Sequence, residues 1–260
     1  MNIRFLGNHS DHNPANGLCD EYRLDGVASL DDLLAACRQL CGQHPDCKPL
    51  LSLDDLPQAR YTAGHARLDL DLGKATPEEQ AGLPPECFEN GEYPGYLNTK
   101  AEFPIALRNF LDQVAGASFA EACNHGLMLT EEALQEWLAF QQDPVALIDQ
   151  PASLLAVPVA DACEALVAFP NGYFECDLGP AQNFAVARHL GAAYGYELMG
   201  VGAAYLGFLR SEPADPTLSS AIAQDLCALY NVAPAERADM ARTFVQAIIG
   251  RTWLSLRYVE

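Results

Sequence analysis

The first strong pattern of apolar and polar positions lies near the N-terminus. Apolar residues recur every three or four positions from Leu30 to Cys41, which is the spacing of one helix face. Ser29 precedes this stretch and is a suitable N-cap, and Asp31 and Asp32 would lie at the positive end of the helix dipole. We therefore predict a helix that begins at Ser29 and ends before the turn at Pro45.

Similar patterns predict the other elements. Helices are expected to start within SLDDL at 52–56 and at Thr130, and to span 101–114, 180–194, 217–230 and 234–249. Strands are expected at 1–6, in the apolar runs LLAVPV and CEALVAFP, in YELMGVG and AAYLGFLR, which would form a hairpin, and in the final WLSLRYV. FPNGYFECDLG at 169–179 predicts another hairpin, because Asn-Gly favours tight turns. Residues 76–99 are rich in Pro, Gly and Glu and predict a loop.

These elements predict an α+β fold with a mixed antiparallel sheet and packed helices. The first part of the chain is richer in expected helices, and the pattern changes near residue 151. We expect a helix-rich N-terminal lobe over 1–150 and an α+β C-terminal lobe over 151–260, and one continuous domain fits the pattern about as well.

Net charge and cysteine content limit the kinds of partner and the cellular compartment that we expect. The formal charge is −20, from 35 acidic and 15 basic residues, which disfavours nucleic acid and anionic membranes and favours a basic partner. The nine cysteines are odd in number and irregularly spaced, and no signal peptide or membrane-spanning run is visible. We expect a cytoplasmic protein with reduced thiols and no cofactor.

Catalytic and metal-binding motifs are few. His9 and His12 in NHSDHN are three residues apart, but the Asn-Pro and Asn-Gly pairs that follow favour a polar turn over a metal site. Cys37, Cys41 and Cys47 lack the spacing of a zinc site, and Cys37 and Cys41 share an apolar helix face. Cys123 and His125 are the residue types of a Cys/His hydrolase, although neighbours in sequence rarely form the working geometry.

The acidic residues form clusters beside aromatic residues. As a strand, LDLDLG at 68–73 would bury its leucines and present Asp69 and Asp71 together to water. Three further carboxylates lie near tyrosines in the 76–99 loop, and carboxylates interleaved with aromatics suit docking on a basic protein. The predicted partner-contact residues are Asp69, Asp71, Glu86, Glu89, Glu92 and Tyr93.

Two stretches resemble known families. LDGVASLDDLLAACRQLCGQHPDCKPLLSLDDLPQAR at 24–60 is similar to the opening of bacterial immunity proteins of polymorphic toxin systems, in the family that accompanies restriction-endonuclease-like nuclease toxins, including those of type VI secretion. VAFPNGYFECDLG through YGYELMGVGAAYLGFLR looks like the strand-rich half of several uncharacterised cytosolic bacterial families. The first resemblance implies an inhibitor that is not an enzyme and that binds a cognate nuclease toxin.

The resemblance and the charge together suggest a function. An inhibitor that covers the basic surface of a nuclease would carry carboxylates and act in the cytoplasm. We expect an immunity protein that occludes the active-site surface of a basic toxin, with no metal. A metal-dependent or Cys/His hydrolase using His9, His12, Cys123 or His125 remains an alternative, as does a scaffolding protein without a toxin, and the oligomeric state stays open.

Overall fold

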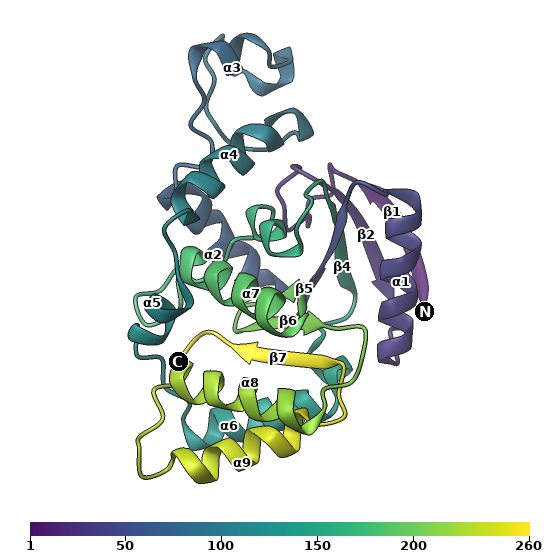
Figure 1. Ribbon diagram of the computed structural model, residues 1–260. Coiled ribbons are helices and arrows are strands. Elements are labelled where there is room, and N and C mark those ends of the chain that lie inside the picture. Colours follow the sequence, from purple (N-terminus) through teal and green to yellow (C-terminus); the bar gives the residue numbers. More distant parts are fainter.

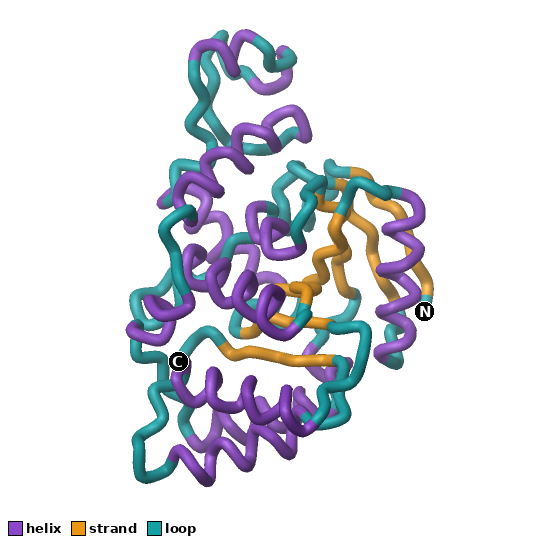
Figure 2. Tube along the Cα trace, in the orientation of Figure 1, coloured by secondary structure: helices purple, strands orange, loops and turns teal.

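The computed structural model describes residues 1–260, and its centre is one seven-stranded sheet. The strands occur in the order β1-β2-β4-β3-β5-β6-β7 and form one band between the two ends of the chain (Figures 1 and 2). Their bounds are β1 Asn2–Gly7, β2 Asp20–Asp25, β3 Lys48–Ser52, β4 Ala152–Val157, β5 Glu197–Val201, β6 Tyr205–Leu209 and β7 Trp253–Arg257. The predicted α+β class with a mixed sheet is confirmed.

Strand β3 links the two halves of the chain. It pairs antiparallel with β4 and parallel with β5, whereas every other neighbouring pair is antiparallel. Residues 1–150 and 151–260 therefore contribute to the same sheet and to one continuous apolar core. The sequence pattern did not predict β3, and the division at residue 150 stays a prediction.

Nine α-helices and four short 3-10 helices surround the sheet. The α-helices are α1 Leu30–Gln43, α2 Leu56–Asp69, α3 Pro77–Ala81, α4 Phe103–Val114, α5 Phe119–Asn124, α6 Glu131–Gln142, α7 Pro180–Tyr194, α8 Pro216–Leu229 and α9 Arg237–Ile248. The 3-10 helices are η1 Pro85–Cys87, η2 Lys100–Glu102, η3 Pro144–Leu147 and η4 Ala162–Val167. None of the helices is long and apolar enough to span a membrane.

Capping residues explain why several helices begin where the sequence predicts. The Ser29 hydroxyl accepts a hydrogen bond from the Asp32 amide at the start of α1, and Thr130 caps α6 in the same way. The expected helix from SLDDL begins at Leu56, because the Asp55 side chain accepts from the Gln58 amide. The predicted helix face of α1 is only partly correct, since Leu33 and Leu40 are buried but Cys41 is exposed.

Helix α6 covers the outer strand of the sheet. The indole nitrogen of Trp137 donates to the Ser255 carbonyl at 2.8 Å, and the Gln141 amide donates to the Trp253 carbonyl and accepts from the Ser255 amide. These side chains hydrogen-bond the backbone groups that an edge strand leaves unpaired, and so protect β7 from pairing with another chain.

Two strand predictions in the second half are wrong. CEALVAFP forms η4, because a short buried apolar run fits a helical turn as well as a strand. FPNGYFECDLG forms a loop, not a hairpin, because Asn171 is buried and accepts from the Thr62 hydroxyl and, through its carbonyl, from the Asn183 amide. Gly172 has φ +97°, and a β-carbon there would clash with the Leu178 carbonyl.

Candidate functional site

The N-terminal NHSDHN segment is a polar turn, as predicted. Asn13 is buried, and its amide donates to the carbonyls of Asn8 and Cys19 while its oxygen accepts from the Ala15 amide. The imidazole of His12 lies 3.4 Å from an Arg60 guanidinium nitrogen. The structure contains no group of three or more His, Cys, Asp or Glu side chains placed to hold a metal ion.

Cys123 and His125 do not form a catalytic pair in this structure. The two ring nitrogens of His125 lie 3.3 Å from the Cys176 carbonyl and from the Gln182 amide. Burial raises the pKa of the Cys123 thiol, which disfavours the reactive thiolate. All nine cysteines are free thiols.

The predicted strand at LDLDLG is wrong. Helix α2 continues to Asp69, and the chain then turns through Asp71, which has a left-handed φ of +50°. Leu72 is buried, but Leu68 is 69% exposed. Asp69 and Asp71 are both exposed, at a helix end and in a turn rather than on one face of a strand.

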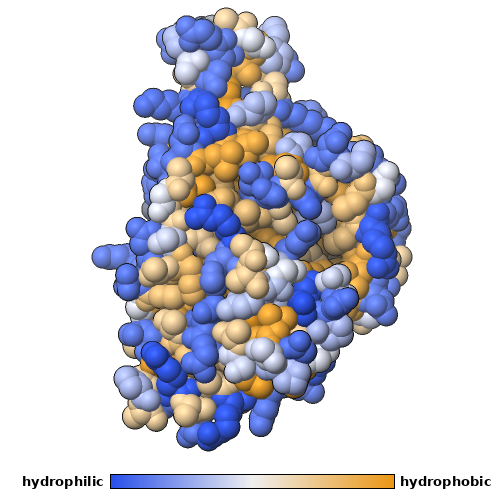
Figure 3. All heavy atoms as spheres, in the orientation of Figure 1, coloured by the Kyte–Doolittle hydropathy of each residue, from blue (hydrophilic) through white to orange (hydrophobic).

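Residues 73–102 form a projecting arm that contains α3, η1 and η2. Figure 1 shows α3 at the end of this arm, away from the sheet. Hydrophilic residues dominate the outer surface of the arm in Figure 3, and apolar residues gather below it over α4. The arm contains most of the predicted contact residues, namely Glu86, Glu89, Glu92 and Tyr93.

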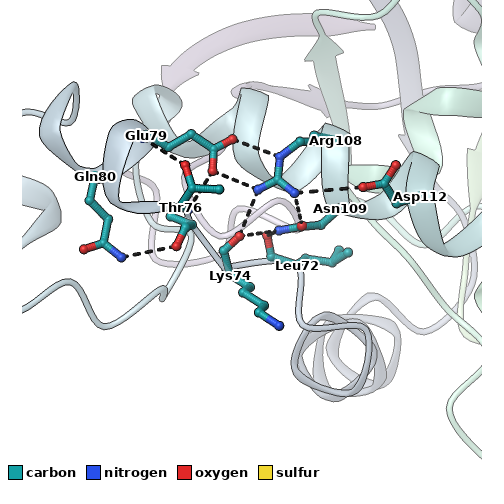
Figure 4. Close-up of polar contacts among 9 residues, drawn as sticks. Leu72, Lys74, Thr76, Glu79, Gln80, Arg108, Asn109 and Asp112 are labelled. Atoms are coloured by element: carbon teal, nitrogen blue, oxygen red, sulfur yellow. Dashed lines mark hydrogen bonds and ion pairs between the residues drawn. The ribbon is translucent and has the colours of Figure 1, made fainter.

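The base of the arm is fixed to helix α4. The Arg108 guanidinium donates two hydrogen bonds of 2.9 Å to the Glu79 carboxylate and one to the Lys74 carbonyl (Figure 4). The Asn109 amide donates to the carbonyls of Leu72 and Lys74. Glu79 also completes the capping box of α3, and its contacts with Arg108 and the Thr76 amide lower its pKa.

A buried carboxylate organises the second half of the arm. Glu102 is 1% exposed and accepts hydrogen bonds from the Tyr93 hydroxyl, from the Thr99 hydroxyl and from the amides of Leu97, Asn98 and Thr99. Tyr93 is thus half-buried with its hydroxyl turned inward, and burial beside Glu102 raises the pKa of its phenol. Tyr93 is the only one of the six predicted contact residues that is not exposed.

The arm also contains an exposed tight hairpin turn. Glu89 and Glu92 exchange both backbone hydrogen bonds at 2.9 Å, and Asn90 and Gly91 between them have φ +52° and +84°. Two central residues with positive φ are characteristic of a type I′ turn. Glu89 and Glu92 are therefore direct cross-strand partners on one face, and both are exposed without a basic partner.

A cleft of about 820 Å³ lies between the arm, helix α2 and the N-terminal turn. Helix α2 contributes Arg60, Tyr61, His65 and Arg67 to its lining, and the arm contributes Lys74 and Tyr96. The only lining carboxylate is Asp71. In a chain with 35 acidic residues, this concentration of cations in one hollow is unexpected.

This cleft was not predicted from the sequence. The N-terminal turn, α2 and the arm form it together, and the turn is distant in the sequence from the other two segments, so no single stretch shows the site. One indication was present: Arg60, Arg67 and Lys74 are spaced by seven residues, and Arg60 and Arg67 lie two turns apart on the same helix.

Comparison with models of known protein families, with curated proteins and with solved structures found no match to this chain.

Proposed function

We propose that this protein is a cytoplasmic immunity protein that binds a basic toxin, a nuclease, and covers its active-site surface with the acidic arm. The observation that carries the proposal is the pairing of Glu89 with Glu92 at the exposed turn. Like charges held directly opposite each other on a sheet face destabilise the free protein. A basic partner would relieve that repulsion, so the pair favours binding over solubility alone as the role of these carboxylates.

The rest of the arm supports the same role. Glu78 and Glu86 are also exposed, and the arm has two lysines, of which Lys100 is paired with Asp20. The arm is held rigidly by Arg108 and Glu102, so little conformational entropy would be lost when it docks. The similarity of residues 24–60 to immunity proteins suggests the class of partner.

The test uses the protein encoded beside this gene, in a catalytically inactive form. Association would be measured by surface plasmon resonance at ionic strengths from about 0.01 to 1 M, a range over which the Debye length falls from about 30 to 3 Å. We expect a stoichiometric complex whose association slows as salt rises. The variant Glu89→Lys/Glu92→Lys should associate at least about tenfold more slowly at low salt, because steering by charge contributes factors of that size.

A matched control separates the arm from net charge. Asp46→Lys/Glu212→Lys changes the net charge by the same amount, at two exposed carboxylates outside the arm that make no side-chain hydrogen bond or ion pair. This control should keep near-native association and protect cells from the active toxin. Equal effects of the two double variants, or no complex with the neighbouring protein, would show that the arm does not have this role.

A further inference from the structure

Arg67 is a buried cation without a counter-charge. Arg67 is 8% exposed, and its guanidinium donates hydrogen bonds to the carbonyls of Pro14 and Ala168. No carboxylate contacts it, and its Nε has no hydrogen-bond partner. Burial is the main reason that the pKa of Arg67 falls to about 10. An unpaired buried charge is costly, so this arrangement indicates that an anion is missing.

The other cations of the cleft increase that cost. Arg60 is close enough to Arg67 to contribute to its lowered pKa. Arg60 itself donates to the Asp11 carbonyl at 2.7 Å and has no acidic partner. Lys74 is exposed, its ammonium forms no ion pair, and its carbonyl is already bound by Arg108. These three cations outnumber the one lining carboxylate, Asp71.

Aromatic and apolar groups line the cleft beside the cations. Tyr61, His65 and Leu68 are spaced three or four residues apart on the exposed side of α2. The Tyr61 and His65 rings pack edge to face, with 4.6 Å between their centroids. Tyr61 is 59% exposed, and Tyr96 on the arm is 54% exposed. Contiguous exposed apolar surface of this kind is characteristic of binding sites.

The walls of the cleft are already in place. The Asn16 amide donates to the Tyr96 and Leu97 carbonyls and so ties the arm loop to the N-terminal turn. Gly17 lies so close to the Asn98 carbonyl that a β-carbon would clash there. A hollow of this size lies within the range of small-molecule sites, which are usually preformed.

We propose that this cleft binds a small organic anion that carries a planar ring. The anionic group would lie among Arg67, Arg60 and Lys74, and the ring would pack against Tyr61 and Tyr96. The cations match a phosphate or a carboxylate, and guanidinium groups bind both with paired hydrogen bonds. This site is separate from Glu89 and Glu92, and the proposal does not depend on binding of a toxin.

Isothermal titration calorimetry with a panel of probes tests the proposal on the full chain. AMP and ADP combine phosphate groups with a planar purine ring through a ribose, and 4-hydroxybenzoate has a carboxylate directly on a planar ring. Adenosine and phenol are their uncharged counterparts. We expect one of the two anion classes to bind at one site, at least tenfold more tightly than its uncharged counterpart, with affinity that weakens as salt rises.

Surface variants identify the site without risking the fold. Lys74→Glu and Tyr61→Ala should each weaken binding of the best probe at least fivefold, whereas Tyr61→Phe should retain it because the ring remains. Arg251→Glu, at an exposed arginine elsewhere, and Glu89→Lys/Glu92→Lys should leave binding unchanged. Failure of every probe to bind, or binding that ignores both Lys74→Glu and Tyr61→Ala, would overturn the proposal and leave Arg67 as a structural link between two carbonyls.

Discussion

Arg108 holds Glu79 through two parallel hydrogen bonds of 2.9 Å, one to each carboxylate oxygen. This fork joins helix α4 to the first turn of α3, and it is the main side-chain link between the arm and the body at that point (Figure 4). Bidentate Arg–carboxylate pairs fix orientation as well as distance. The arm can therefore project into solvent and still keep one direction.

Arg108→Ala should loosen the arm without unfolding the protein. Amide hydrogens of α3 and of the loop that follows should exchange several-fold faster, while those of β4 and β5 keep their protection, because local openings differ in free energy across a structure. Arg108→Lys should give an intermediate result. Hydrogen exchange followed by mass spectrometry measures the protection in both variants. Protection of α3 in Arg108→Ala that equals the wild-type value would show that the Arg108–Glu79 pair is dispensable for arm order.

The same fork makes arm order depend on pH. Hydrogen bonds from Arg108 lower the pKa of Glu79, so its stabilising contribution is present above the ordinary pKa of a glutamate. That contribution is lost as pH falls through the lowered pKa. We expect the protection of α3 amides against hydrogen exchange to fall at acidic pH in the wild type. In Glu79→Gln this protection should be low at every pH and should not change over the same range.

Glu102→Ala should destabilise the protein and disorder residues 93–99. The substitution leaves the amides of Leu97, Asn98 and Thr99 without their acceptor, and hydrogen bonds to a charged group contribute about 1.5–3 kcal/mol each. We expect a loss of about 2–4 kcal/mol in urea unfolding, with a smaller loss for Glu102→Gln, which keeps one oxygen. Glu132→Ala, at an exposed helix position, serves as the control, and equal stability of both variants would contradict the assigned role.

Ionisation of Asp54 should lower the free energy of unfolding as pH rises. Burial raises its pKa to about 6, and its Oδ1 has no hydrogen-bond partner while its Oδ2 accepts from the Ala204 amide. A carboxyl with a raised folded pKa binds its proton more tightly in the folded state, so the cost of ionising it is absent below the unfolded pKa of about 3.9 and complete above pH 6.

Asp54→Asn removes that ionisation. Relative to the wild type, we expect the variant to gain about 1–3 kcal/mol between pH 4 and pH 7, which corresponds to a shift of one to two pKa units. Urea unfolding at a series of pH values measures the difference, and Asp46→Asn at an exposed turn is the control. A constant difference across that range would contradict the raised pKa.

Two glycine substitutions should have opposite effects. A β-carbon at Gly207 in β6 would lie 2.5 Å from the Trp253 ring, so Gly207→Ala should destabilise by about 1–3 kcal/mol through overpacking. Gly42 in α1 has open space around it, so Gly42→Ala should stabilise by roughly 0.5–1 kcal/mol through helix propensity. Thermal unfolding distinguishes them, and loss of stability in both would mean that α1 is not helical at Gly42.

Local sequence chemistry predicted several of the elements whose ends are capped. Ser29 and Thr130 mark true helix starts, and the hairpin of β5 and β6 was also predicted correctly. Asn-Gly was less reliable as an indicator. Asn90-Gly91 forms the tight turn, whereas Asn171-Gly172 lies in a loop because Asn171 itself accepts hydrogen bonds from Thr62 of α2 and Asn183 of α7. Tertiary contacts that the sequence does not show decided between the two.

The site was harder to predict than the fold. Apolar and acidic residues alternate in LDLDLG, as they would in a strand. Leu68 and Asp69 are nevertheless the last residues of α2, so the helix extends into the segment for which the alternation predicts a strand. The net charge favours a binding site made of carboxylates, so it gives no indication of a site formed by Arg60, Arg67 and Lys74. The cleft depends on contacts that bring the N-terminal turn against α2 and the arm, and the turn is distant from both in the sequence.

The position of β3 in the sheet has a consequence for synthesis. Leu51 pairs with Leu154 and Gly200, about 100 and about 150 residues later in the chain, and such distant pairings slow folding. On the ribosome, the apolar segment around Leu50 and Leu51 would emerge long before its partners and would remain unpaired. The nascent chain should therefore be a substrate for holdase chaperones until the last third of the protein has been made, although the arm, with its local contacts, can form much earlier.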